Sequence, residues 1–270
     1  MELLLSHAQK LTADIRSLSE DMDVVALNDL PKNDQMNRFD KKFIFNVALV
    51  PDLLKKAGDA YAILESNGTR IFNYYSDYFD TADYRMYTHH HNGKKNRCKI
   101  RIREYLNSGD QFLELKHKNN RSFTTKKRMP YSGNFPLTAD ADTFIKNNTP
   151  FDADGLIYAL STRYQRITLV NKQKSERITI DFNLHLSTSN EQVKLENLAI
   201  AEIKNNDRHL RSPFNQLLKL HQIKQESFSK YCMGMALLNP KVKNNLFKEK
   251  ILKIKKIEHE PIDCYSQSSL

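Results

Sequence analysis

The chain has 270 residues, 42 of them Lys or Arg and 32 Asp or Glu, which gives a formal charge of +10 and a pI near 9.3. Apolar residues make up 40% and aromatic residues 10%, enough for a substantial core, so general disorder and fibrous repeats are excluded. No apolar run approaches the roughly 18 residues of a membrane span, and residues 1–20 are too polar for a signal peptide, so we expect a cytoplasmic protein.

Hydrophobic periodicity predicts a helix over residues 1–30, followed by a polar linker to residue 37 that contains Pro31. Period-two alternation then predicts strands over residues 38–43, 99–103, 112–118, 177–182 and 199–204. Further helices are expected over residues 51–66, 140–148 and 213–238. The chain thus divides into an N-terminal helix and linker (1–37), a strand-rich domain (38–240) and a Lys-rich tail (241–270).

The positive charge is concentrated in two segments. Residues 94–128 carry twelve Lys or Arg and three acids, a net of +9, and residues 241–256 carry seven Lys and one Glu, a net of +6. The remainder of the chain is therefore acidic, with a net of −5. The three cysteines, Cys98, Cys232 and Cys264, are far apart and lack C-x-x-C spacing, so we expect free thiols and neither disulfides nor a structural zinc site.

Each predicted strand places charged side chains on one face. Lys99, Arg101 and Arg103 alternate in one strand, and Lys116 and Lys118 alternate in the next. Like charges side by side on one face destabilise a sheet unless water or a polyanion lies between them. The charged face could be open to solvent, or it could line a barrel of about eight strands, whose interior admits one slender ligand.

Eight short segments resemble, in the same order, the bacterial branch of the VTC domain family. They lie at residues 38–43, 78–81, 90–105, 113–119, 164–166, 177–181, 201–204 and 228–231. This family comprises polyphosphate polymerase domains of the triphosphate tunnel metalloenzymes, a CYTH-like superfamily. The resemblance implies an α+β fold in which about eight antiparallel strands form a closed barrel, the triphosphate tunnel, with surrounding helices.

The resemblance also implies roles for individual residues. The positions that match the family's catalytic phosphate-binding residues are Lys42, Arg101, Arg103, Lys116, Arg166, Arg177 and Lys230. Glu202 matches its metal-binding carboxylate, for Mn²⁺ or Mg²⁺. Further phosphate-binding candidates on the same strand faces are Lys99, Lys118, Lys126, Arg128 and Lys204, and the cluster at 126–128 allows more than one register for Lys126.

Two positions depart from the family pattern. The wider superfamily opens with a Glu-x-Glu-x-Lys strand, whereas this chain has Arg38, Asp40 and Lys42, which favours the polymerase branch over a two-metal hydrolase. Eukaryotic members carry a second lysine one turn before the position of Lys230, where this chain has Ser227. Lys219 or Lys224 could substitute for it.

We therefore expect a metal-dependent polymerase that transfers the terminal phosphoryl group of ATP to polyphosphate. Transfer of this kind needs positioning and charge neutralisation and no side-chain nucleophile. The alternatives are a non-catalytic polyphosphate-binding subunit, a tripolyphosphatase and a single-stranded nucleic-acid binder. The last is disfavoured because Asp40, Glu114, Asp181 and Glu202 share the basic strand faces and would repel a phosphodiester backbone.

Three other features have more than one interpretation. The tail could contact an anionic membrane or a membrane-protein partner, guide the polymer, or be an ordinary solvated helix. The histidines at 89–91 could suggest a metal site, but Asn92-Gly93 beside them indicates a hairpin tip. One of the tyrosines at 74, 75, 78, 84 and 87 could stack on a base, although aromatic residues in strands are more often core.

Overall fold

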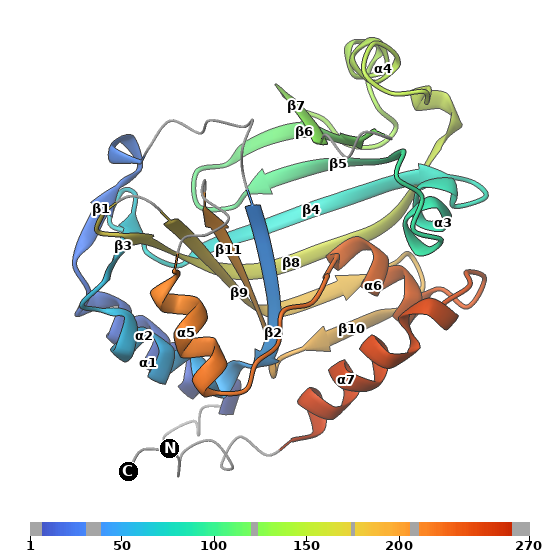
Figure 1. Ribbon diagram of the computed structural model, residues 1–270. Helices are drawn as coiled ribbons and strands as arrows, with labels where there is room; N and C mark the ends of the chain where they lie inside the picture. The colour runs from blue at the N-terminus through green and yellow to red at the C-terminus, as the bar shows by residue number, and fades with distance from the viewer. Residues whose placement is uncertain (1–6, 31–38, 120–123, 174–175, 206–210, 261–270) are drawn as a thin grey trace, which may run out of the picture.

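The computed structural model describes residues 7–30, 39–119, 124–173, 176–205 and 211–260. Arg38 and Cys264 lie outside the described residues. A strongly curled sheet dominates the molecule, with helices on its outer side and at one end (Figure 1). Among the described residues, no helix combines the length and the apolar character needed to cross a lipid bilayer.

The principal path of the sheet is β2-β11-β9-β8-β4-β5-β6-β7, and each neighbouring pair along it is antiparallel. In that order the strands are Phe39–Asn46, Leu198–Asn205, Glu176–Ser187, Leu156–Asn171, Phe72–Thr81, Arg97–Tyr105, Asp110–Lys118 and Thr124–Pro130. Three shorter strands bring the total to eleven: β1 (Val24–Ala26), β3 (Tyr61–Glu65) and β10 (Gln192–Leu195). β3 joins β1 to β8, and β10 extends β9.

The expected closure into a barrel of about eight strands is wrong. The sheet has eleven strands, and within the described ranges no pairing joins the edge strands β2 and β7. Both edges carry lysines on the concave face, Lys42 on β2 and Lys126 on β7, and β7 is largely exposed. Charged residues at an edge oppose further strand pairing, because side chains of like sign would then lie side by side. The result is an open trough.

Helices cover the outer face of the sheet in two places. α1 (His7–Glu20), α2 (Val50–Ala57) and α5 (Pro213–Leu220) pack on the outward side chains of β2, β8, β9 and β11, and their apolar residues form one core cluster. α4 (Ala139–Lys146) covers β5 and β6, where Ile100, Ile102, Leu113 and Leu115 are buried. The lysines and arginines that alternate with these apolar residues therefore face the concave side.

One end of the concave face is filled by α3 (Arg85–His91), α6 (Lys230–Leu238) and α7 (Lys248–His259), on the right in Figure 1. Here Ile44 and Ile200, which point inward, pack with Met233, Met235 and Ile254 in a second apolar cluster. α6 begins where the hydroxyl of Ser229 accepts a hydrogen bond from the Cys232 amide. The short 3₁₀ helices are Leu27–Asp29, Val47–Leu49, Ala153–Gly155 and Asn245–Phe247.

Several expected elements differ from those observed. The helix expected over 51–66 ends at Ala57, and the apolar run that follows is the buried strand β3. The helix expected over 213–238 is two helices, separated at residues 221–229. The N-terminal helix ends at Glu20 and is followed by β1. His89 to His91 form the last turn of α3 instead of a hairpin tip, and Asn92-Gly93 terminate that helix.

Candidate functional site

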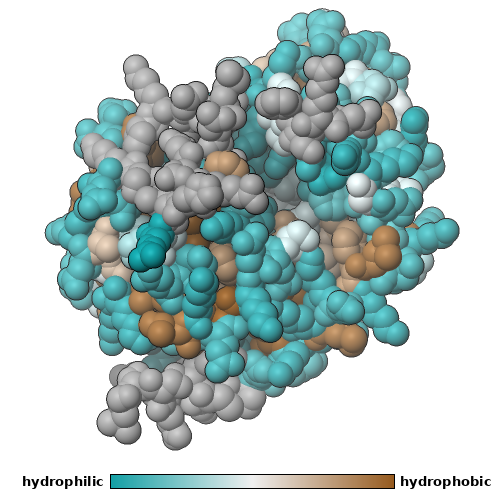
Figure 2. All heavy atoms as spheres, in the orientation of Figure 1, coloured by the Kyte–Doolittle hydropathy of each residue, from teal (hydrophilic) through white to brown (hydrophobic). Residues whose placement is uncertain are grey.

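The concave face holds a cavity of about 490 Å³, which we call the trough. Seven of the eight principal strands line it with charged side chains, and β4 contributes Tyr78. The residue before α6 and its first residue, Ser229 and Lys230, close one side. Figure 2 shows that hydrophilic residues cover most of one face of the molecule. The cations that line the trough are Lys42, Lys99, Arg101, Arg103, Lys116, Lys126, Lys127, Arg128, Arg166, Lys204 and Lys230.

Three lysines form a row across β5, β6 and β7. Lys99 is the register partner of Lys116, and Lys116 is the register partner of Lys126, so their side chains lie next to one another without an acid in the row. The Lys116 side chain is exposed by its surface area, yet its amine is crowded by the trough walls: desolvation and the neighbours Lys99, Lys42 and Lys126 lower its pKa to about 7. Among the described residues, no carboxylate lies in register with this row, and Glu202 offsets the repulsion at Lys116 only in part.

The next row along the same strands has its own carboxylate. Glu114 lies between its register partners Arg101 and Arg128 and accepts hydrogen bonds from Arg101, at 2.8 Å from Nε and 2.5 Å from Nη2. Arg101 also donates to the hydroxyl of Tyr78 at 2.9 Å. Burial alone would raise the pKa of Tyr78, but Arg101 and its cationic neighbours lower it to about 8. Arg103 donates to the hydroxyl of Tyr164 at 3.1 Å.

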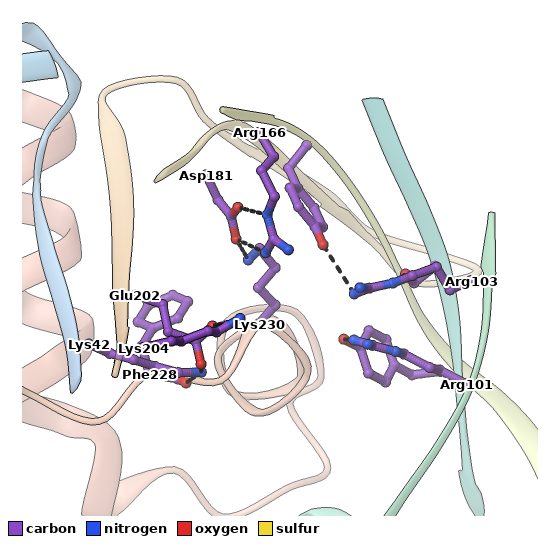
Figure 3. A network of polar contacts seen from close by, with 12 residues as sticks. Lys42, Arg101, Arg103, Arg166, Asp181, Glu202, Lys204, Phe228 and Lys230 are labelled. Carbon is purple, nitrogen blue, oxygen red and sulfur yellow. Dashed lines mark hydrogen bonds and ion pairs between the residues drawn. The ribbon is translucent and has the colours of Figure 1, made fainter. Parts of the chain in front are cut away.

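A second carboxylate, Asp181, orders two cations from other elements (Figure 3). Arg166 forms a two-pronged ion pair with it, at 2.5 and 2.8 Å, and Lys230 of α6 also donates to it. Although burial acts to raise the pKa of Asp181, Arg166 and Lys230 hold it well below its usual range. The ring of Tyr164 supports both cations, with Lys230 Nζ 4.1 Å and Arg166 Cζ 5.4 Å from its centroid.

Glu202 is held more loosely than the other two carboxylates. Its oxygens lie 4.0 Å from Lys42 Nζ and 3.3 Å from Lys204 Nζ. Burial opposes ionisation, but Lys204 and Lys42 lower the pKa of Glu202, so it carries a negative charge at neutral pH. In Figure 3, Arg101 and Arg103 extend from one side of the trough toward the space between Asp181 and Glu202 on the other.

The model of the VTC domain matches residues 37–149 and 155–239, which is most of the chain. The chain belongs to the VTC domain family. This confirms the family assignment made from the sequence, and no curated protein matches the chain.

Solved structures resemble this VTC domain in fold at low sequence identity. A Bacillus halodurans protein described as a candidate adenylate cyclase shares 15% identity, with a TM-score of 0.47 over 72% of this chain and 96% of its own. A Hippeastrum protein, HpAC1, described as an adenylyl cyclase candidate with a dominant triphosphatase activity, shares 12% identity, with a TM-score of 0.48 over 75% and 99% of the two chains. A Pyrococcus horikoshii protein, PH1012, shares 12% identity, with a TM-score of 0.41 over 72% and 98%.

The trough contains the donors for a divalent metal only in part. No group of three His, Cys, Asp or Glu side chains able to hold a metal occurs in the described part of the chain. Glu202 fits a hard cation best, because its cationic neighbours lie 3.3 Å or more away. Asp40 also lines the trough and is the register partner of Lys204, next to Glu202. One or two carboxylates are enough for Mg²⁺ or Mn²⁺ when phosphate oxygens and water complete the shell.

Eleven of the thirteen residues predicted from the sequence line the trough of the VTC domain. The exceptions are Lys118 and Arg177, which lie beyond the lining: Lys118 is two residues from Lys116 on β6, and Arg177 is four residues from Asp181 on β9. Sequence reasoning gave no site role to several trough residues, namely Asp40, Tyr78, Glu114, Lys127, Tyr164, Asp181, Phe228 and Ser229. The sequence did indicate that the acids face the site, because they alternate with apolar residues on the same strand faces as the cations.

The tyrosines considered from the sequence have different surroundings. Tyr78 lines the trough and stacks on Tyr231 with centroids 5.2 Å apart, whereas Tyr87 is buried, packs edge-on against Phe247 and donates to the carbonyl of Lys243. Tyr74 stacks on Tyr164, and the guanidinium groups of Arg103 and Arg166 lie over its ring. Cys98 and Cys232 are buried free thiols, as expected.

Proposed function

We propose that this VTC domain is a metal-dependent polyphosphate polymerase that takes the terminal phosphoryl group of ATP. The observation that carries the proposal is the acid-free row of Lys99, Lys116 and Lys126 beside the loosely held Glu202. A row of cations without counter-ions suits a chain of phosphates, and a nearby available carboxylate suits a metal on the reacting phosphate. Family membership supports the same reaction class.

In this proposal the terminal oxygen of polyphosphate forms a bond to the γ-phosphorus of ATP, the bond from that phosphorus to the β-bridging oxygen breaks, and ADP leaves. Arg101 and Arg103 hold the transferring group through forked donors, and the lysine row holds the acceptor chain. Glu202, with Asp40, would hold Mn²⁺ or Mg²⁺, which neutralises charge on the phosphates when bound. Arg166 and Lys230, fixed by Asp181, neutralise charge on the opposite wall.

The test is incubation of the purified protein with ATP and Mn²⁺, with long polyphosphate followed on gels and free phosphate measured in parallel. Polymer is the expected result. Phosphate without polymer would overturn the proposal in favour of a tripolyphosphatase. The absence of both products would overturn it in favour of a non-catalytic binding module. ATP as donor is consistent with the cytoplasmic location expected from the sequence.

Glu202→Ala separates an enzyme from a binder. We expect turnover to fall by at least about a hundredfold, because a metal ligand is lost. Affinity for tripolyphosphate without metal should be retained, because the cations remain and a repelling charge has gone. Calorimetry for binding and the gel assay for turnover make the comparison. A variant that produces polymer at the rate of the unsubstituted protein would show that the metal role of Glu202 is wrong.

A further inference from the structure

The segment between α5 and α6, residues 221–229, positions several trough cations. The carbonyl of Phe228 accepts a hydrogen bond from Lys42 Nζ at 3.2 Å, and the hydroxyl of Ser229 accepts one from Lys99 Nζ at 2.6 Å. Lys230 follows directly and donates to Asp181. The location of this segment therefore determines where three ammonium groups lie, although most of it has no regular secondary structure.

On one side, β2 holds the segment through its backbone. The Glu226 amide donates to the carbonyl of Lys42 at 2.8 Å, and Gln225 forms an isolated antiparallel bridge with Phe43. These contacts fix the segment at one edge only. A short stretch attached along one edge opens easily unless other groups hold its opposite side.

On the other side, two lysines of α7 contact the segment. Lys250 Nζ donates to the carbonyl of Ser227 and lies 3.0 Å from its hydroxyl oxygen. Lys253 Nζ forms an ion pair with the carboxylate of Glu226. Both lysines are partly buried, whereas Lys255 on the same helix is exposed.

α7 is itself firmly anchored to the sheet. Ile254 and Ile257 are buried, 1% and 6% exposed, in the cluster that includes Ile44 and Ile200. At its end, Asn197 Nδ2 donates to the carbonyl of Glu258 at 2.9 Å, and Asn46 Nδ2 donates to that of Ile257 at 3.4 Å. α7 begins at residue 248, beyond the family match, which ends at residue 239.

We propose that α7 is a positioning element of the trough: Lys250 and Lys253 hold residues 225–229 against β2 and so set the positions of Lys42, Lys99 and Lys230. The two lysines act through the segment and do not touch phosphate. Two of the charged residues of the Lys-rich tail thus have a structural role in support of the trough. The inference rests on the proposed function only in one respect: it takes the trough to be the phosphate-binding site.

The variants are Lys253→Met, Lys250→Met with Lys253→Met, and the charge swap of Glu226→Lys with Lys253→Glu. Lys255→Met is the matched control, because it also removes one charge from α7. For the double variant we expect tripolyphosphate affinity, by calorimetry, to fall about three- to tenfold, and kcat and the KM for polyphosphate both to change. The charge swap should recover most of the affinity lost in Lys253→Met. The Lys255→Met variant should stay within about twofold of the unsubstituted protein.

A second measurement does not depend on ligand or activity. Hydrogen exchange of the peptide covering residues 221–230 should accelerate several-fold in the double variant and remain unchanged in Lys255→Met. Equal loss of affinity in Lys253→Met and Lys255→Met would show that net charge alone acts and would overturn the proposal. Unchanged exchange in the double variant would overturn it as well. Failure of the unsubstituted protein to make polymer would refute the proposed function while leaving both comparisons valid.

Discussion

At the scale of single residues, the trough contains two kinds of cation. Arg101, Arg166 and Lys230 are each tied to a carboxylate, which fixes their geometry before any ligand arrives. Lys99 and Lys116 have no acid in their row, so their mutual repulsion persists until an anion enters. The first kind can orient a bound anion and the second can attract one, and the proposed polymerase reaction requires both.

Replacing Lys116 tests this distinction. The folded protein lowers the pKa of Lys116 to about 7, far below the value of about 10.4 in an unfolded chain. Protonation of Lys116 therefore favours unfolding. The resulting loss of folding stability is absent above the pKa of the unfolded chain, grows as the pH falls from that value to about 7, and is constant below about pH 7. Lys116→Met should raise the Tm of the ligand-free protein by roughly 1–3 °C at pH 7 and weaken tripolyphosphate binding about tenfold.

The same pKa predicts proton uptake on binding. An anion favours the charged amine and raises the pKa of Lys116, so a proton is taken up and affinity rises as pH falls from 9 to 7. Calorimetry at pH 8 in two buffers of different ionisation enthalpy measures the proton number. Lys116→Met should reduce it, and Lys255→Met should not. Equal uptake in both variants would contradict the assignment.

At the scale of elements, the trough depends on how closely α6 packs against β8. A Cβ atom on Gly234 would overlap with Cδ2 of Leu160, which is fully buried, and would lie 2.9 Å from its Cδ1. Asp80, at the end of β4, links α6 to α3: it accepts hydrogen bonds from the amides of Met86 and Tyr87 and from the hydroxyl of Tyr231. These contacts fix the helix that begins with Lys230.

Gly234→Ala should therefore destabilise the protein. The overlap with Leu160 costs about 1–3 kcal/mol and outweighs the helix preference of Ala, which is up to about 1 kcal/mol. We expect a net loss of about 1–2 kcal/mol in urea unfolding, with weaker tripolyphosphate binding because Lys230 moves with α6. Gly155→Ala is the control, since its added methyl group meets no atom within 4 Å. Equal stability of the two variants would show that α6 has room to move.

Each strand with alternating charge could be predicted from its own sequence. Most residues of the site could be predicted together with these strands. Lys99, Arg101 and Arg103 share a face because side chains in a strand alternate with period two, whatever the tertiary structure. The interruption of the expected helix over 213–238 could not be predicted in this way. Residues 221–229 depart from a helix because β2 and α7 offer them partners, and these partners are distant in sequence.

At the scale of the whole molecule, closure of the sheet was the property least accessible from the sequence. The pattern of inward charges is the same for an open trough and a closed barrel. In both, the outer face of the sheet is apolar and covered by helices, and the inner face is lined with charged side chains. The difference depends on whether the edges β2 and β7 meet, and their lysines oppose that pairing. The periodicity of each strand does not indicate whether two edge strands pair with each other.

The overall charge arrangement also predicts which polyanion is preferred. Asp40, Glu114, Asp181 and Glu202 line the same trough as the cations, and they disfavour a phosphodiester backbone that carries one charge per bulky unit. In filter binding with radiolabelled polyphosphate, unlabelled polyphosphate should compete roughly a hundredfold better than oligo-dT of equal phosphate number. Equal competition would favour the nucleic-acid binder considered from the sequence.

The division of the sheet into an apolar outer face and a charged inner face has an evolutionary consequence. Ile100 and Ile102 pack in the core on the outer side, while their neighbours Arg101 and Arg103 face the trough. Selection for a new substrate can therefore act on every second residue of a strand without disturbing the apolar contacts made by the others. Chemistry on this scaffold can diverge widely while the fold is inherited unchanged.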